Sequence, residues 1–167
     1  TPAYDDMFVR AARFANRYFQ NYLGDDYGVH WRRRFNVSEN PLRAGSDLIG
    51  DLFPETRDLA QDAHPFPWPY VQQSWTMVIE PPRYMNHLLQ DFRLAGGEVV
   101  VRTFEDRDEV LGLAEPVILN CSGLGARELF EDESLIPIKG QLTVLLPQPE
   151  LDYIMVGGGL YMIPRAD

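Results

Sequence analysis

One segment carries most of the information about the fold, and it reads Pro116-Val117-Ile118-Leu119-Asn120-Cys121-Ser122-Gly123-Leu124-Gly125-Ala126-Arg127-Glu128-Leu129-Phe130. It opens with an apolar run, 117–119, that has the length of a short buried strand. The next residues, 120–123, are small or turn-forming, and apolar side chains at the end of the segment can face inward from a helix. The segment therefore predicts a strand that turns sharply into a helix. In an open α/β sheet, ligands bind at that end of a strand.

The glycines of this segment match only part of a phosphate-binding fingerprint. Gly123 and Gly125 provide G-x-G, but the third glycine of G-x-G-x-x-G would fall at Glu128. A carboxylate repels a pyrophosphate because both groups carry negative charge. An ordinary strand-to-helix connection is the simpler explanation of the pattern taken alone, and a ligand site is the alternative.

Composition and charge are those of a globular protein without a polyanionic partner. The chain has 167 residues, of which 45% are hydrophobic and 24% charged, enough for one domain with a core. Its net charge of -10 argues against a nucleic-acid or anionic-membrane surface. No apolar stretch is long enough to span a bilayer, and no signal peptide is visible at the start. The single cysteine is compatible with a reducing compartment.

The first half of the sequence predicts a helix, a strand and a long loop. Asp5 or Asp6 can cap a helix that ends at Gly24, and its aromatic residues are expected to pack in the core. Alternation over 29–37 predicts a strand in which Arg33 falls with the apolar set and is expected to be partly buried and paired. A solvated or ion-paired strand is the favoured interpretation of the three arginines at 32–34, and an anion-binding site is the alternative. The region 38–73 is expected to be irregular, with a helical turn or two within 48–59.

A proline-rich run within that loop reads His64-Pro65-Phe66-Pro67-Trp68-Pro69-Tyr70. Prolines at every second position exclude a helix and favour extended backbone. The run is either a loop held by aromatic packing or a lid over a binding site.

The second half predicts alternating strands and helices. Strands are expected at 74–80, 98–102, 138–146 and 153–163. A helix opened by Pro81-Pro82 and stopped at Gly96 or Gly97, and a short acidic helical connection at 106–113, lie between them. The run Gly157-Gly158-Gly159 either permits a close backbone approach inside the last strand or forms a hairpin tip.

Side-chain chemistry offers no catalytic group and no metal site. The three histidines, at 30, 64 and 87, are far apart and lie in different predicted elements. Cys121 has no histidine or cationic neighbour, and its apolar run predicts a buried thiol rather than a nucleophile. Ser122-Gly123 does not fit the G-x-S-x-G pattern of serine hydrolases.

Three blocks in order resemble the FAD-dependent D-amino acid oxidase family: 117–129, Pro137-Ile138-Lys139-Gly140-Gln141-Leu142 and Leu160-Tyr161-Met162-Ile163-Pro164-Arg165. An upstream helix and valine strand, 84–101, fit the family as well. The resemblance is clear from about Trp75 onward and looser before it. It implies an α+β fold: a mixed, mostly antiparallel sheet with helices for the substrate domain, plus a remnant of an α/β FAD-binding domain.

The resemblance also implies a division of the chain. Residues 1–74 would form the helix, strand and lid-like loop region of the substrate domain, 75–131 the remnant of the FAD-binding domain, and 132–167 further substrate-domain strands. A family member carries its main dinucleotide motif before the position of Thr1. It carries a substrate-carboxylate arginine and a glycine-rich flavin-contacting segment after the position of Asp167. We therefore expect the sequence to be the central piece of a longer protein, inactive by itself and only marginally stable.

The family's chemistry implies FAD as cofactor, O₂ as oxidant and a D-amino acid, or a related amine such as glycine or sarcosine, as substrate. Hydride passes from the substrate Cα to flavin N5, the imino acid hydrolyses to a 2-oxo acid and ammonia, and O₂ reoxidises the flavin to give H₂O₂. No side-chain base is required. Neither a nucleic-acid nor a membrane partner is expected, a homodimer is left open, and an intracellular location, cytoplasmic or peroxisomal, is favoured.

Site residues follow from the matched positions. The Tyr161 hydroxyl is expected to hydrogen-bond the substrate carboxylate, with ring packing in a strand as the alternative. Cys121, Ser122 and Gly123 stand where the family's Asn-Cys-Thr-Gly approaches the adenosine and diphosphate of FAD, and the backbone near Phe104 stands where the family approaches the adenosine.

One position departs from the family and one alternative function remains. Some members carry a second pocket tyrosine where this sequence has Gly157, which leaves the substrate preference open. Gly140 and Gln141 match a family Gly-Gln that supports the pocket structurally. The alternative is a non-catalytic fold or assembly module of a flavoprotein that binds no cofactor.

Overall fold

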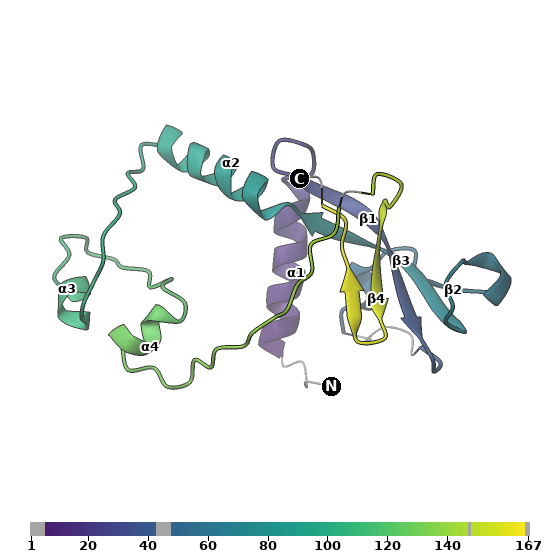
Figure 1. Ribbon diagram of the computed structural model, residues 1–167. Helices are drawn as coiled ribbons and strands as arrows, with labels where there is room; N and C mark the ends of the chain where they lie inside the picture. The colour runs from purple at the N-terminus through teal and green to yellow at the C-terminus, as the bar shows by residue number, and fades with distance from the viewer. Residues whose placement is uncertain (1–5, 43–47, 147, 166–167) are drawn as a thin grey trace. The chain divides into compact units, whose positions relative to one another are not determined.

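The computed structural model describes residues 6–42, 48–146 and 148–165 (Figure 1). The chain splits into two compact units, the first made of Thr1–Gly96 and Leu146–Asp167 and the second of Gly97–Leu145. Of the two predicted helix caps, Asp5 lies outside the described residues. The predicted boundaries at 74/75 and 131/132 stay predictions, because compactness by itself does not assign a segment to a substrate or a flavin domain.

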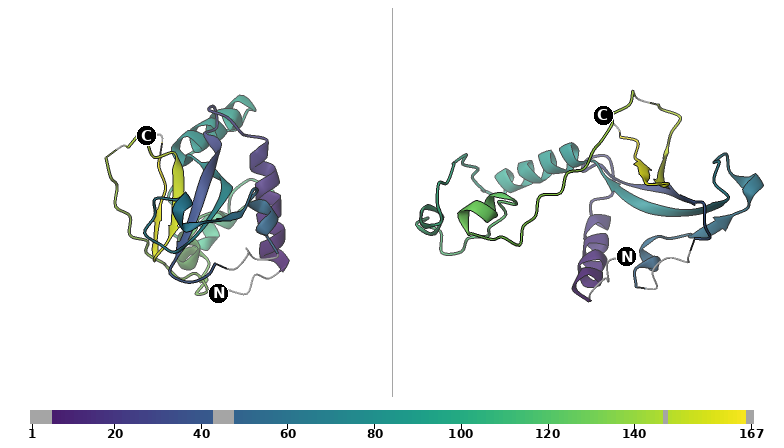
Figure 2. Two further views of the ribbon diagram at one scale, coloured as in Figure 1. Left: turned by 90° about the vertical axis from the view of Figure 1, so that its right-hand side faces the viewer. Right: turned by 60° about the horizontal axis from the view of Figure 1, so that its bottom comes forward.

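The first unit contains a sheet with the strand order β2-β3-β1-β4-β5. Its strands are β1 (Val29–Ser38), β2 (Arg57–Leu59), β3 (Tyr70–Ile79), β4 (Tyr153–Gly157) and β5 (Leu160–Met162). All neighbouring pairs are antiparallel except β1 and β4, which are parallel. The long strands β1 and β3 curve together through the sheet (Figure 2). A mixed, mostly antiparallel sheet with helices confirms the predicted α+β class.

The first unit contains two helices, and the ends of α2 have local causes. Helix α2 (Pro81–Leu94) has prolines in its first turn, where a missing N–H costs no hydrogen bond, and the chain leaves it through Gly96 at φ +88°. Helix α1 (Asp6–Gln20) confirms the predicted N-terminal helix, although none of its described residues is buried. The expectation of core packing for its aromatic residues is therefore wrong.

The aromatic side chains of α1 instead form a partly exposed cluster with the following loop and α2. The ring centroids of Phe19 and Tyr84 are 5.4 Å apart, and those of Tyr22 and Tyr27 are 4.7 Å apart. The hydroxyls of Tyr18 and Tyr22 are 3.0 Å apart and share a hydrogen bond.

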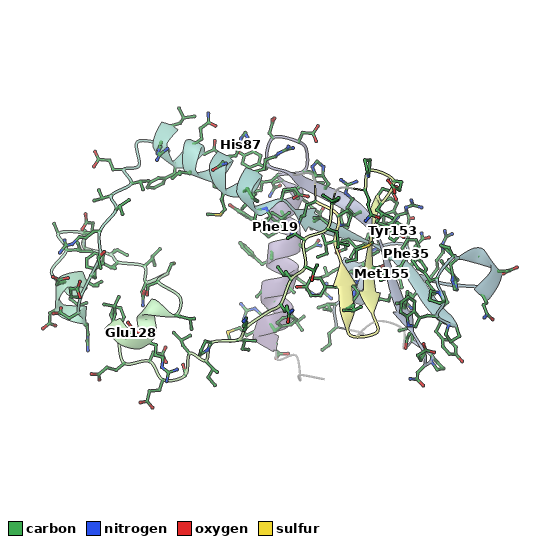
Figure 3. All side chains as sticks on the ribbon, viewed as in Figure 1. Phe19, Phe35, His87, Glu128, Tyr153 and Met155 are labelled. Atoms are coloured by element: carbon green, nitrogen blue, oxygen red, sulfur yellow. The ribbon has the colours of Figure 1, made fainter. Side chains whose placement is uncertain are left out.

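The core of the first unit lies on one face of the sheet. Phe35, Val37 and Val71 are buried there. Tyr153 and Met155 of β4 pack against them, and Figure 3 shows these two beside Phe35. The proline-rich loop covers this face: the ring centroids of Phe66 and Phe35 are 5.1 Å apart with the rings tilted, and Trp68 joins the same cluster. Aromatic packing, one of the two predicted interpretations of the loop, is confirmed.

The hairpin of β4 and β5 replaces the single strand predicted over 153–163. Gly158 and Gly159 lie at its tip with φ +58° and +77°, a conformation that suits glycine. Gly157, at φ +150°, passes so close to β1 that a Cβ on it would lie 2.0 Å from the carbonyl oxygen of Val37. The hairpin tip and the close backbone approach, predicted as alternatives, therefore both occur.

The second unit holds two short helices, α3 (Arg107–Leu111) and α4 (Gly125–Leu129), within the described residues. Helix α3 confirms the predicted helical connection. The strands predicted at 98–102, 117–119 and 138–146 are wrong: the chain there is irregular, and Val101 and Leu119 are 98% and 85% exposed. A strand needs a hydrogen-bonded neighbour, and no described segment pairs with these apolar runs.

Candidate functional site

The turn predicted at 120–123 is present and leads into α4, which begins at Gly125. The Asn120 Oδ1 accepts hydrogen bonds from the Ser122 N–H at 3.2 Å and from the Ser122 Oγ at 2.7 Å, a side-chain turn typical of asparagine. Gly123 follows at φ +57°, and the N–H of Ala126 donates to its carbonyl at 3.0 Å. The turn thus folds locally, because Asn120 and Ser122 supply its side-chain hydrogen bonds and Gly123 lacks the Cβ that a positive φ disfavours.

The turn leaves backbone groups accessible. A Cβ at Gly123 would meet nothing within 4 Å. The N–H groups of Gly123 and Leu124 donate no hydrogen bond within the described part of the chain. The thiol of Cys121 is exposed, so the predicted buried thiol is wrong. Free N–H donors beside open space suit a ligand rich in acceptors, such as a phosphate or a ribose.

Phe104 lies in a separate segment of the same unit. The guanidinium carbon of Arg102 lies 4.7 Å from its ring centroid, a cation–π distance. The chain then enters α3, where Asp106 Oδ1 accepts the N–H of Glu109 and Glu109 Oε2 accepts the N–H of Glu105, each at 2.9 Å. In the described residues, no hydrogen bond, ion pair or ring contact joins Phe104 to the 120–123 turn. The structure thus brings Cys121, Ser122 and Gly123 together in one turn, without Phe104.

Tyr161 lies on β5, the edge strand of the sheet in the first unit. It pairs with Val156 of β4, and its side chain is 58% exposed. Within the described chain its ring stacks on no other aromatic ring, and its hydroxyl has no hydrogen-bond partner. The hydroxyl is therefore available to a ligand on that face.

On the face of the sheet that carries Tyr161, strand β1 is covered by a loop. Val156 pairs with Asn36, so Arg34, two residues earlier on β1, shares the face of Tyr161. The Arg34 guanidinium lies over the Phe53 ring at 4.8 Å, and burial lowers the pKa of Arg34. The loop that carries Phe53 thus covers β1, whereas the hairpin of β4 and β5 keeps Tyr161 open.

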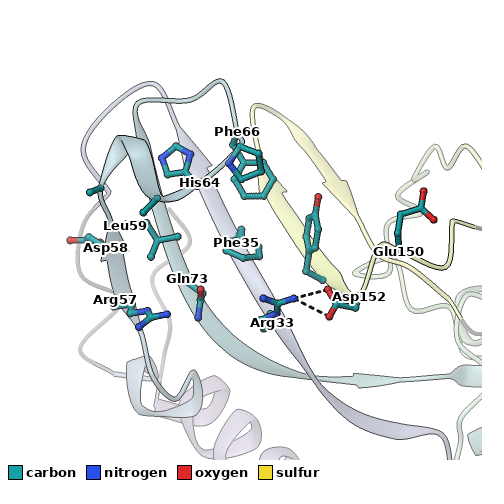
Figure 4. A pocket seen from close by; sticks show the side chains of 14 residues that line it. Arg33, Phe35, Arg57, Asp58, Leu59, His64, Phe66, Gln73, Glu150 and Asp152 are labelled. Carbon is teal, nitrogen blue, oxygen red and sulfur yellow. Dashed lines mark hydrogen bonds and ion pairs between the residues drawn. The ribbon is translucent and has the colours of Figure 1, made fainter.

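An open pocket of about 630 Å³ lies on the opposite face of the sheet (Figure 4). Arg33 and Phe35 line it, and they alternate along β1 with Arg34 and Asn36, so they point away from the face of Tyr161. Arg33 Nη2 donates to both carboxylate oxygens of Asp152, at 2.8 and 2.9 Å. The prediction that Arg33 is paired is thereby confirmed.

The pocket was not predicted from the sequence. Its walls come from β1, from the continuous segment of β2 and the proline-rich loop, from β3, and from the start of β4 with the residues before it. Residues near 33, 60 and 152 thus meet although they are distant in the chain. Both ring nitrogens of His64 are buried there without a hydrogen-bond partner in the described structure. The one sequence signal for this pocket was Arg33 among apolar residues, and the sequence did not predict its partner Asp152.

Two further features bear on the class of site. The described residues contain no group of three or more His, Cys, Asp or Glu side chains placed to hold a metal ion. None of the described helices has the length and apolar character needed to cross a membrane.

Comparison with known proteins identifies a family and several relatives. The model of the FAD dependent oxidoreductase family matches residues 6–167. A D-amino acid oxidase of Dugesia ryukyuensis is 24% identical over 171 residues, 98% of this chain and 51% of the relative. A D-amino-acid oxidase of Rubrobacter xylanophilus is 41% identical over 93 residues, 53% of this chain and 28% of the relative.

A third relative carries a different substrate in its name. A D-aspartate oxidase of Homo sapiens is 36% identical over 143 residues, 83% of this chain and 41% of the relative. The chain thus spans about half, or less, of the length of these relatives.

Proposed function

Because the chain belongs to the D-amino acid oxidase family of FAD-dependent oxidoreductases, we propose that it forms part of an enzyme that oxidatively deaminates D-amino acids or related amines. The products would be a 2-oxo acid, ammonia and H₂O₂. The observation that carries the proposal is the family match over residues 6–167, which includes both the 120–123 turn and β5. FAD, when bound, supplies the hydride acceptor, and the protein binds and orients the substrate.

The 120–123 turn fits a role in holding FAD. Its exposed residues, the open space beside Gly123 and the unpaired N–H groups of Gly123 and Leu124 support contacts of Cys121, Ser122 and Gly123 with the adenosine and diphosphate. The N–H and carbonyl of Phe104 itself make no hydrogen bond within the described residues, which suits contacts with the adenosine. The assignment of 75–131 to the FAD-binding part of the enzyme belongs to the same proposal.

Tyr161 fits a role in holding the substrate. Its exposed hydroxyl has no partner in the described chain and can donate to a substrate carboxylate. Position 157 cannot add a second tyrosine, because a side chain there would collide with the backbone of Val37. On the face of Tyr161 this hairpin therefore offers the substrate one hydroxyl, since Tyr153 lies on the opposite face, and the choice among D-amino acids rests on other groups.

Cofactor binding is tested in the full-length protein that contains this sequence. The protein is incubated with excess FAD and desalted, and the flavin absorbance is recorded for the wild type, Gly123→Ala and Gly96→Ala. Both glycines have a positive φ and open space around a built Cβ, so both substitutions carry a similar backbone cost. Loss of flavin is expected for Gly123→Ala alone. Equal retention by both variants would remove the turn from the site.

Substrate binding is tested with Tyr161→Phe against Tyr70→Phe, a matched change at another exposed tyrosine of the sheet. A lost hydrogen bond to a charged carboxylate costs about 1.5–3 kcal/mol, so KM for D-alanine should rise about 10- to 100-fold for Tyr161→Phe only. A flavin-loaded full-length protein that releases no H₂O₂ from D-amino acids, glycine or sarcosine would refute the oxidase. A full-length protein that binds no flavin would favour the alternative, a non-catalytic module.

A further inference from the structure

A buried carboxylate marks the junction between the sheet and α2. Glu80 follows the last residue of β3, and its side chain is 7% exposed. Its backbone holds it on both sides: its N–H donates to the Gly28 carbonyl at 2.8 Å, and its carbonyl accepts the N–H of Tyr84 at 2.9 Å. A carboxylate held in such a place is costly unless a cation pairs with it.

Arg165 provides that cation. Its Nη1 lies 3.6 Å from Glu80 Oε2 and donates a hydrogen bond of 2.9 Å to the carbonyl oxygen of Ile79. Within the described residues, the Glu80 carboxylate has no other side-chain partner. The neighbouring Arg83 donates to the carbonyl of Asp25 instead. One guanidinium thus contacts the backbone at the end of β3 and the buried charge beside it.

The place of Arg165 in the chain gives this contact a consequence. Strand β5 has three residues and pairs with β4 only, so few hydrogen bonds hold it at the edge of the sheet. Arg165 follows three residues after β5 ends at Met162 and attaches the chain to β3, which lies beyond β4 and β1 in the sheet. Tyr161 therefore lies between two anchors, the hairpin tip and the Arg165 contact.

We propose that Arg165 is a positioning residue: through Glu80 and the Ile79 carbonyl it holds β5 in place and so fixes the position of the Tyr161 hydroxyl. The effect on substrate binding rests on the proposed function of Tyr161, whereas the effect on β5 does not. The ion pair is partly screened because the Arg165 side chain is 40% exposed, so its contribution is local rather than decisive for folding.

The test uses the full-length protein with Arg165→Gln, Arg165→Lys and Glu80→Gln, and with Arg93→Gln as a control at an arginine that forms no ion pair in the described structure. Amide hydrogen exchange is measured at 160–162 and along β3. We expect Arg165→Gln to speed exchange in β5 about tenfold with β3 unchanged, Arg165→Lys to restore part of the protection, and Arg93→Gln to change neither strand. Glu80→Gln removes the charge without leaving a buried unpaired carboxylate, so it gives a result even where Arg165→Gln does not fold.

The second readout is steady-state kinetics with D-alanine. Positioning predicts that KM rises in Arg165→Gln while kcat changes little, and that lysine restores KM in part. Exchange that rises equally in β3 and β5, or in neither, would overturn the proposal, and so would a faster-exchanging β5 with unchanged KM. A flavin-loaded protein that is inert to D-amino acids refutes the proposed function instead, and exchange alone then decides whether Arg165 anchors β5.

Discussion

Replacing Gly157 with alanine probes the closest approach between β4 and β1. An ideal Cβ at this position lies 2.0 Å from the carbonyl oxygen of Val37 and 2.6 Å from Val37 Cγ2. Ordinary contacts of a Cβ begin at 3.4 Å, so the paired strands must move apart by more than an ångström. The backbone at φ +150° adds strain for any residue with a side chain.

The expected cost follows from these two effects. Overpacking against a backbone costs about 1–3 kcal/mol, and a disfavoured φ costs about 1–3 kcal/mol, so Gly157→Ala should lower the free energy of unfolding by about 2–6 kcal/mol. Gly159→Ala is the control, because φ there is +77° but nothing lies within 4 Å of the built Cβ. It should lose only the backbone contribution, about 1 kcal/mol.

Urea-induced unfolding of the full-length protein measures the difference. Tryptophan fluorescence is a suitable probe, since the Trp68 ring lies 3.3 Å from a Cβ built on Gly158 at the hairpin tip. Equal losses of stability for the two variants would refute the reasoning, because they would show that β1 and β4 are not in the register of Val37 and Gly157. A large loss for Gly157→Ala would also explain why this position cannot hold a tyrosine.

Three further predictions concern the aromatic residues and a helix cap. The hydrogen bond with Tyr18 raises the pKa of Tyr22 from 10.0 to about 12. The stabilisation from this hydrogen bond is therefore complete below pH 10.0 and is lost as the pH rises through about 12. Ultraviolet titration of tyrosinate should show a late-ionising group that returns toward the ordinary value in Tyr18→Phe, and an unchanged titration would contradict this. Phe66→Ala should destabilise the first unit by about 2–4 kcal/mol in urea, because the ring packs on two core rings; a loss under 1 kcal/mol would mean that the loop does not cover the sheet. Asp106→Ala removes the acceptor for the Glu109 N–H and should cost about 1 kcal/mol, seen as roughly fivefold faster exchange of that amide, whereas exchange elsewhere stays unchanged.

Local patterns were sufficient for the features that depend on neighbouring residues. Helix α2 begins at its two prolines, and the 120–123 turn forms because asparagine, serine and glycine satisfy it within four residues. The resemblance to the oxidase family also came from contiguous blocks, and the family match over residues 6–167 confirms it.

Local patterns failed where a feature needs a distant partner. The apolar runs at 98–102, 117–119 and 138–146 have the composition of strands. Composition does not determine, however, which segment would form the backbone hydrogen bonds that a strand needs. In the same way, the aromatic stripe of α1 has the spacing of a core helix, yet its rings stay partly exposed and pack on one another and on Tyr84 of α2.

The candidate site shows the same division between local and tertiary information. Tyr161 was identified from its own block of sequence, but only the register of β1, β4 and β5 assigns it to the face opposite the pocket with Arg33. The pairing of Arg33 with Asp152 joins residues 119 positions apart, and that of Arg165 with Ile79 spans 86. Side chains alternate along a strand with a period of two, so a shift of one residue would exchange the two faces, and no local pattern decides between them.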